Sequence, residues 1–484
     1  MQYPAPSHSG RSAKAALLCG LMLFAGCTVG PHYQKPALTT PAAWTAGPAT
    51  SAQATLEQDW WKHLNDPVLD GLIKEALAGN YDLKIAEARI AQARATQAYA
   101  RADILPSADV KGSVTREGNE LPFPGGTNLP FDLTKPFNIF QTGFDASWEL
   151  DLFGGKRSAE QGATAEFQAA QATRDDMRIS VLAEVARTYI DIRGNQQQLT
   201  IANDRIAAEQ ETLKIAKERF ASGDAPKLDV IQAQSQLEQA ESQLPHYQNL
   251  LIQSELAIDV LLGHQPGYTQ GLVTEVKPVP VGDKNLVLAA PADVIAHRPD
   301  IHAAERQLAS ATAQQDVATA QLFPDVSLSG FFGLFTTEGG QLLHAASRSW
   351  NIGGSVIWPI LNYSRISANI DLANAKQQEA LAQYQKSIVG ALSDVERSLT
   401  AYSKEEEHRD LLEKTVATNH KAVDIARERY KAGLSSFIEV LDAERTLYTS
   451  QSQAADADAA TTQNLIAMYK SLGGGWQEKP PQSH

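Results

Sequence analysis

The chain has 484 residues and is acidic, with 42 Lys and Arg against 56 Asp and Glu and a formal net charge of −14. An excess of negative charge argues against nucleic acid as a partner. Only 7% of the residues are aromatic and Ala and Gln are abundant, which suits long helices better than a compact enzyme core.

Residues 1–26 are predicted to be a signal peptide that ends at a lipidated cysteine. Arg11 and Lys14 precede an apolar run that is too short to span a bilayer. The run closes in "FAGC", which resembles a bacterial lipobox, so we expect cleavage before Cys27 and acylation of its thiol. After cleavage this cysteine has no disulfide partner in the chain. Residue 28 is Thr and not the Asp that would favour retention in the inner membrane, so the outer membrane is favoured. The alternative is a plain signal peptide with an incidental cysteine.

The rest of the sequence offers no catalytic or metal-binding motif. Cleavage removes two cations and no acid, so the net charge falls to −16. "LFGGKRS" lacks the first glycine of a phosphate loop, because position 150 is Leu. HExxH and GxSxG are absent, "EEEH" at 405–408 reads as a solvated helix face, and only two methionines remain. We predict no enzyme, no metal and no cofactor beyond the lipid on Cys27.

An internal duplication organises the chain. "IAKERFASG" (215–223) recurs as "IARERYKAG" (425–433), at an offset of 210. "DLKIAEARIAQARA" (82–95) recurs as "DIHAAERQLASATA" (300–313), at an offset of 218. Such a period is far too long for a solenoid. Each half reads as short helices, a β segment, a very long helix, a turn and a second long helix.

The β segments alternate between an apolar and a polar face. This alternation runs through 140–151, 326–334 and 350–358. The apolar face holds Phe140, Phe144, Ala146, Trp148, Leu150, Val326, Leu328, Gly330, Phe332, Leu334, Trp350, Ile352, Val356 and Trp358. A period of two over about ten residues, with aromatic residues near the ends, fits strands of a membrane barrel. Two soluble hairpins packed on a core are the alternative.

The long helices carry apolar residues every seven positions, which specifies supercoiled helix pairing. Residues 156–222 as one helix would be about 100 Å long. Gly223 and Gly433 are predicted to end the long helices before tight turns. The three stripes are Val185, Ile192, Leu199, Ile206, Leu213 and Phe220; Leu381, Ile388, Val395, Tyr402, Val416, Val423 and Tyr430, interrupted by Arg409; and Val230, Leu237, Leu244, Leu251 and Ile258.

Four strands per chain cannot close a membrane barrel. About eight strands is the smallest barrel found in membranes, and an open sheet edge is not tolerated in lipid. The chain must therefore oligomerise. A dimer would give about eight strands packed with side chains, and a trimer about twelve strands with room for a lumen.

These features resemble the TolC family of outer-membrane efflux channels, in particular its OprM- and NodT-like lipoprotein branch. The resemblance covers about residues 27–476 and rests on the lipobox, "ASWELDLFGGKRSA", "RPDIHAAERQLASATA", "RERYKAGLSSFIEVLDAERTLY" and "YKSLGGGW". It implies a fold of mixed α and β structure: a homotrimeric barrel in the outer membrane of a Gram-negative cell, continued by a helical tunnel across the periplasm. It also implies two partners, a periplasmic adaptor and an inner-membrane pump, often of the resistance-nodulation-division type.

The resemblance also divides the chain into segments. We expect a signal peptide (1–26), an N-terminal extension toward an equatorial belt (27–66), first-half short helices (67–106), a first β-hairpin (107–153), a first long helix pair (154–263), an equatorial linker (264–290), second-half short helices (291–323), a second β-hairpin (324–361), a second long helix pair (362–472) and a C-terminal tail (473–484).

The resemblance assigns the adaptor contact to the two helix tips, with Arg219 and Gly223 at one and Arg429 and Gly433 at the other. The alternative is that the two arginines only cap their helices, where a cation near the last carbonyls is favourable.

A gate is expected on the second helix pair. At the offset of 210, Asp442 and Arg445 stand where the first half has Gln232 and Ser235. An acid and a base three residues apart share one helix face. The resemblance implies that this helix pair closes the periplasmic mouth, with three copies of Asp442 around the axis and Ile438 one turn closer to the tip. An ordinary exposed ion pair is the alternative.

The predicted function is therefore a passive exit channel for small molecules such as drugs or other toxic compounds. A type I protein-secretion channel of the same fold is the first alternative, although that branch usually lacks the lipobox. A structural coiled-coil lipoprotein is the second, although it would show no duplication. The exported substrate is not evident from the sequence.

Overall fold

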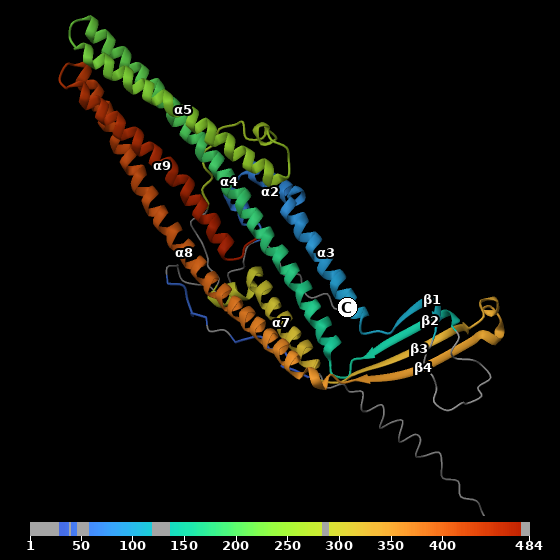
Figure 1. The fold of residues 1–484 in the computed structure, drawn as a ribbon. Helices are drawn as coiled ribbons and strands as arrows, with labels where there is room; N and C mark the ends of the chain where they lie inside the picture. Colours follow the sequence, from blue (N-terminus) through green and yellow to red (C-terminus); the bar gives the residue numbers. More distant parts are fainter. Residues whose placement is uncertain (1–28, 38–39, 46–57, 119–135, 283–289, 476–484) are drawn as a thin grey trace, which may run out of the picture. The chain divides into compact units, whose positions relative to one another are not determined.

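The computed structural model describes residues 29–37, 40–45, 58–118, 136–282 and 290–475. The chain falls into two compact units, each assembled from three stretches of sequence. Of the described residues, the first unit takes those within 29–36, 91–169 and 305–383, and the second takes those within 37–90, 170–304 and 384–475. Figure 1 traces the order of the helices and strands along the chain.

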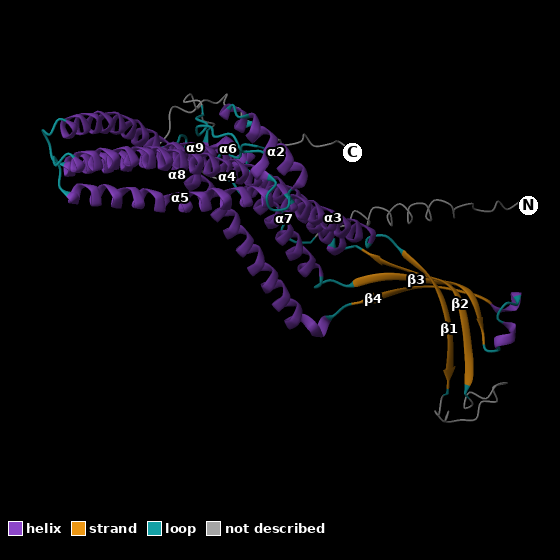
Figure 2. Ribbon diagram, turned by 90° about the horizontal axis from the view of Figure 1, so that it is seen from above, coloured by secondary structure: helices purple, strands orange, loops and turns teal. Residues whose placement is uncertain are grey.

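The first unit contains one antiparallel sheet of four strands. Its strands are β1 (Ser107–Glu117), β2 (Phe137–Leu150), β3 (Asp325–Thr336) and β4 (Arg348–Ile357), and they pair in this order. The four strands lie side by side as one curved layer (Figure 2). Both halves of the duplicated sequence thus contribute one hairpin to the same sheet.

The register separates the two faces of the sheet as the alternation predicts. One row across all four strands pairs Val110 with Phe144, Phe144 with Phe332 and Phe332 with Trp350. All four side chains are exposed in the single chain. The opposite face carries Asp109 paired with Asp145, together with a band of serines. The sheet has one apolar and one polar face, as a membrane barrel requires.

Phe331 departs from this pattern, because it is a large aromatic residue on the polar face and is only 7% exposed. Its ring lies against Gly143 and Gly333, which face each other across β2 and β3. A Cβ atom at Gly143 would lie 2.6 Å from Cα of Gly333. The close approach of the two backbones therefore requires glycine at this pair, and the ring covers the space that side chains would otherwise fill.

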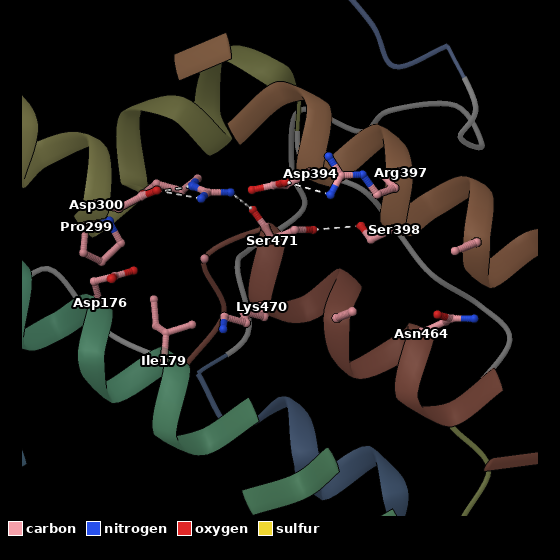
Figure 3. Close-up of a pocket in the computed structure, with 14 residues that line it drawn as sticks. Asp176, Ile179, Pro299, Asp300, Asp394, Arg397, Ser398, Asn464, Lys470 and Ser471 are labelled. Carbon is pink, nitrogen blue, oxygen red and sulfur yellow. Dashed lines mark hydrogen bonds and ion pairs between the residues drawn. The ribbon is translucent and has the colours of Figure 1, made fainter. Parts of the chain in front are cut away.

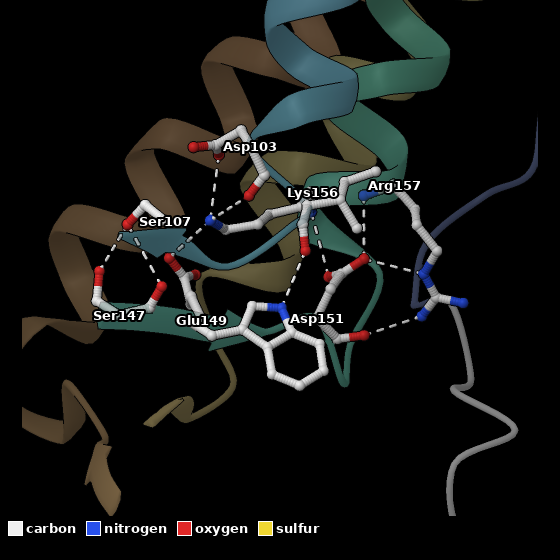
Figure 4. A network of polar contacts seen from close by, with 9 residues as sticks. Asp103, Ser107, Ser147, Glu149, Asp151, Lys156 and Arg157 are labelled. Carbon is white, nitrogen blue, oxygen red and sulfur yellow. Dashed lines mark hydrogen bonds and ion pairs between the residues drawn. The ribbon is translucent and has the colours of Figure 1, made fainter. Parts of the chain in front are cut away.

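The sheet connects to the long helices through a polar network (Figure 4). Asp151, expected as a strand residue, instead accepts hydrogen bonds from the backbone N–H of Lys156 (3.2 Å) and Arg157 (3.0 Å), at the start of α4 (Gly155–Ala221). Its carboxylate thus serves the first turn of that helix, whose N–H groups lack partners within the helix. Lys156 Nζ forms ion pairs with Asp103 (3.1 Å) and Glu149 (3.2 Å).

The duplication is also visible at the end of the sheet from which the long helices continue. The indole of Trp148 donates to the carbonyl of Ile104 (3.0 Å), and that of Trp358 donates to the carbonyl of Leu322 (3.1 Å). The two tryptophans are 210 residues apart and make the same contact in each half. Trp358, expected within a strand, lies just after β4.

The second unit contains most of two antiparallel helix pairs, whose longer helices begin within the residues of the first unit. We call α4 with α5 (Lys227–Leu262) the first helix pair, and α8 (Tyr363–Lys431) with α9 (Phe437–Ser471) the second helix pair. The seven-residue stripes face inward as predicted over much of their length, since Val185, Ile192 and Val395 are fully buried. Phe220, at the end of the first stripe, is an exception at 46% exposed. Arg409 does not leave the packed face, because it is buried and paired with Asp410 (3.2 Å).

Shorter helices complete both units, and the core of the second unit lies where they meet the long ones. They are η1 (Trp60–Leu64), α2 (Pro67–Gly79), α3 (Tyr81–Ala102), α6 (Pro291–His297) and α7 (Pro299–Ala320). The core includes Trp60, Leu69, Ile73, Leu182, Ile190, Ile258 and Met468. Among the described helices, none is both long and apolar enough to cross a membrane.

Candidate functional site: the helix tips

The two helix tips have the same backbone, as their repeated sequence predicts. After α4 the N–H of Gly223 bonds the carbonyl of Phe220 (3.1 Å), and after α8 the N–H of Gly433 bonds that of Tyr430 (3.0 Å). Both glycines have positive φ angles, +81° and +75°. Only glycine adopts this region freely, which is why it ends both helices. A Cβ atom on Gly223 would meet no other atom within 4 Å, so this exposed turn has open space around it.

Arg219 does not simply cap its own helix. Its guanidinium lies over the ring of Tyr430, 4.5 Å from the ring centroid, and donates to the carbonyl of Tyr430 in the last turn of α8. It also donates to the carbonyl of Asp224 in its own turn (3.1 Å). Arg429 reaches only its own turn, at the carbonyl of Leu434 (3.4 Å). Of the two arginines proposed for the tips, one links the two helix pairs.

Tyr430 is the centre of this link, which the sequence did not reveal as a functional position. It is 4% exposed, and its hydroxyl donates to Asp229 Oδ2 of α5 (3.0 Å). Burial and the bond to Asp229 raise the pKa of Tyr430 to about 12 against the effect of Arg219, so it remains a donor at neutral pH. The only sequence signal was a tyrosine in a stripe whose first-half counterpart is Phe220.

The proposed gate residues lie on the surface of α9. Arg445 donates to Asp442 Oδ1 (2.6 Å), and the two side chains are 71% and 68% exposed. Ile438 is also exposed, at 64%. Within one chain this is the exposed pair that the spacing predicts, and such pairs contribute little to stability. Ser436 and Glu439 form a capping box at the start of the same helix.

The second unit also holds a cavity of about 290 Å³ near the end of α9 (Figure 3). Arg298 lines it, pairs with Asp300 (2.7 Å) and donates to the carbonyl of Ser471 (2.7 Å). Asp176 faces the same space, and burial raises the pKa of its carboxyl. Asp394, Arg397 and Lys470 also line the cavity, so its three acids balance its three bases. Arg298 joins the start of α7 to the end of α9.

Cys27, the expected lipidation site, lies outside the described residues. The segment that follows it is held in the first unit: the N–H of Val29 bonds the carbonyl of Phe153 (3.2 Å), and the hydroxyl of Tyr33 donates to Glu305. Across the described part of the chain, no group of three His, Cys, Asp or Glu is arranged to hold a metal ion.

Comparisons with known proteins place the chain in a family. The family described as outer membrane efflux protein matches residues 72–264 and 290–474. The chain therefore belongs to the outer membrane efflux protein family. It is an outer-membrane channel and not an enzyme.

Two curated relatives illustrate the similarity. The pyoverdine export outer membrane protein OpmQ of Pseudomonas putida is 32% identical over 449 residues, which cover 92% of this chain and 94% of OpmQ. The solvent efflux pump outer membrane protein SrpC of Pseudomonas putida is 30% identical over 483 residues, which cover 96% of this chain and 98% of SrpC. Both alignments run along nearly the whole length of each protein.

Solved channels share the fold. The outer-membrane channel OprN superposes with a TM-score of 0.86 at 32% identity, covering 93% of this chain and 100% of OprN. The open state of MtrE from Neisseria gonorrhoeae gives a TM-score of 0.79 at 27% identity, covering 93% of this chain and 98% of MtrE. The expected fold class, a TolC-type trimeric channel of mixed α and β structure, is confirmed.

Proposed function

We propose that the chain forms a passive trimeric duct through which a periplasmic adaptor and an inner-membrane pump export small toxic molecules. The observation that carries this proposal is the open four-stranded sheet with one apolar and one polar face. Its two edge strands, β1 and β4, need partners in lipid, and three chains supply about twelve strands around a water-filled lumen. Relatives are named for the export of solvent, toluene, antibiotics and pyoverdine, which supports small molecules as cargo.

The helix tips are proposed to meet the adaptor. Their turns are exposed, Leu434 is 70% exposed, and both glycines have conformations that side chains oppose. Replacing Gly223 and Gly433 together by Val should abolish export. Export is measured as the antibiotic tolerance of a strain whose own copy of the gene is deleted and replaced by the variant. The trimer should still form.

The matched control is Gly267→Val. Gly267 also has a positive φ, +96°, and open space around it, but it lies outside the tips. Export should persist in this control. Unchanged export in the tip variant at normal trimer levels would exclude docking at the tips.

The lipid on Cys27 is proposed as a second membrane anchor beside the barrel. Each buried CH₂ of an acyl chain contributes about 0.8 kcal/mol, so the anchor adds to an insertion that the barrel already provides. Cys27→Ser should abolish labelling by radioactive fatty acid and impair signal cleavage without preventing membrane insertion. Labelling at the unmodified level would disprove acylation at this residue.

A further inference from the structure

A cluster of charged side chains lies buried between the two helix pairs, deeper than the tips. Glu209 of α4 and Glu444 of α9 are 2% and 1% exposed. Arg427 of α8 contacts Glu444 Oε1 through its Nη2 (2.6 Å) and its Nε (2.7 Å). Thr212 of α4 donates to the same oxygen (2.9 Å). Glu444 therefore joins the first helix pair to both helices of the second.

Glu209 is poorly compensated in this cluster. Its Oε1 lies 3.8 Å from Nε of Arg205, too far for a hydrogen bond. The Oε2 atoms of Glu209 and Glu444 both lack a hydrogen-bond partner within the described chain. Burying a carboxylate with so few partners is costly unless it takes up a proton. Accordingly, burial and the charge of Glu444 raise the pKa of Glu209 to about 7, although Arg205 and Arg427 oppose the shift.

Tyr448 and Arg427, which lie near Glu209, both stay protonated near neutral pH. Burial and Glu444 raise the pKa of Tyr448 on α9 to about 12. Burial lowers the pKa of Arg427, but Glu444 outweighs it and holds that pKa above its ordinary value. From α5, the neutral side chains of Ala240, Gln243 and Tyr247 line the adjoining groove with Arg205 and Tyr448.

The duplicated half has a neutral residue at the position of Glu209. At the offset of 210, Asn419 of α8 occupies the position that Glu209 has on α4. Its amide donates to Ser450 Oγ of α9 (3.1 Å). This bond lies within the second helix pair, whereas Glu209 faces Glu444 of the other pair. The repeat therefore has a neutral residue at this position, and Glu209 adds a charge that can be switched.

We propose that Glu209 and Glu444 form a proton-dependent clasp between the two helix pairs, closed when Glu209 is neutral and loosened when both carboxylates are charged. A proton on Glu209 removes the repulsion from Glu444 and converts an acceptor without a partner into a donor. Loss of the proton leaves two buried carboxylates beside each other, which water relieves when the helix pairs separate. The clasp changes channel conductance only if the second helix pair is the gate, as proposed. It changes the distance between the two helix pairs in either case.

The direction of the pH dependence follows from the raised pKa. The closed clasp binds more protons than the open one between the ordinary glutamate pKa, about 4.5, and about 7. Closure is therefore fully favoured below that interval, and the preference is lost as pH rises toward 7. Opening should increase up to about tenfold per pH unit in each subunit, or about 300-fold over the interval.

The test measures helix spacing and conductance on the same trimers between pH 5 and 8. Spin labels on Lys217→Cys of α4 and Glu428→Cys of α8, both exposed positions, report the distance between the pairs. Planar-bilayer recordings of unlabelled trimers report opening. Glu209→Gln should keep the short distance and low conductance at every pH. Glu211→Gln, an exposed acid on the same helix, should behave as the unmodified protein.

Each outcome decides one proposal. A label distance that stays constant with pH in the unmodified protein overturns the clasp, as does the same pH response in Glu209→Gln. Spacing that follows pH while conductance does not would support the clasp and refute the gate. Glu209→Asn, with the residue found at the equivalent position of α8, is a second neutral variant in case Gln disturbs folding.

Discussion

The two helix pairs derive from one repeated sequence, yet their tips interact differently. Tyr430 is buried and bonded to both Arg219 and Asp229 of the first pair. Its counterpart Phe220 is 46% exposed, and Arg429, the counterpart of Arg219, reaches only its own turn. Among the described residues of one chain, side chains of the first pair therefore hold Tyr430 of the second, and Arg429 makes no equivalent contact with the first. A duplicated backbone has been kept while its side chains became specialised, as expected if only one pair moves during gating.

The largest effect on stability is expected from a residue that distinguishes α4 from α8, deeper in the second unit than the tips. Arg193 of α4 is 1% exposed and donates to Tyr189, Gln196 and the carbonyl of Glu275. Its counterpart in α8 is the exposed Ser403. Arg193→Ala should cost about 3 kcal/mol or more, because several buried acceptors lose a charged donor. The trimer should dissociate at a clearly lower temperature in detergent gels, whereas Ser403→Ala should dissociate as the unmodified trimer does.

Tyr430→Phe should have a smaller effect than Arg193→Ala. It removes the hydroxyl that bonds Asp229 while keeping the ring beneath Arg219. One hydrogen bond of this kind contributes about 1 kcal/mol, so the link between the pairs should weaken about fivefold. Open-channel events in planar bilayers should become more frequent. Phe220→Leu, at the equivalent exposed position, serves as control; an equal response in both variants would contradict the asymmetry of the tips.

The last comparison is between the two arginines at the tips. Arg219→Ala loses a contact over an aromatic ring, worth about 0.5–1 kcal/mol at a partly exposed site, together with a hydrogen bond to the other pair. Arg429→Ala loses one long bond within its own turn. Protease cleavage at the tips of purified trimers should be faster for the first variant and unchanged for the second. Equal cleavage rates would assign both arginines to simple helix capping.

Sequence periodicity predicted the strands, the long helices and the glycines that end them, since these depend on local conformation and on which face is apolar. It did not predict contacts set by tertiary neighbours. Asp151 was placed in a strand but serves the start of α4. Arg409 interrupted the apolar stripe yet is buried with its own ion pair. Phe331 lies on the polar face because two glycines across the sheet leave room for its ring.

The candidate site was predicted in part. The tips followed from the repeated "RFASG" and "RYKAG", and the Asp442–Arg445 pair followed from its spacing. The contacts of Tyr430 and of Glu209 join residues about 200 or more positions apart. No periodicity in a single sequence specifies which residues of two separate helix pairs will meet.

The central proposal, that the second helix pair closes the periplasmic mouth, is tested most directly by single-channel conductance. Asp442→Ala with Ile438→Gly should raise the conductance of purified trimers in planar bilayers, reduce their preference for cations and admit large antibiotics such as vancomycin. The equivalent first-half variant, Gln232→Ala with Leu228→Gly, should leave all three unchanged. Conductance and ion selectivity identical to the unmodified trimer in the second-half variant, or an equal rise in both variants, would contradict the account.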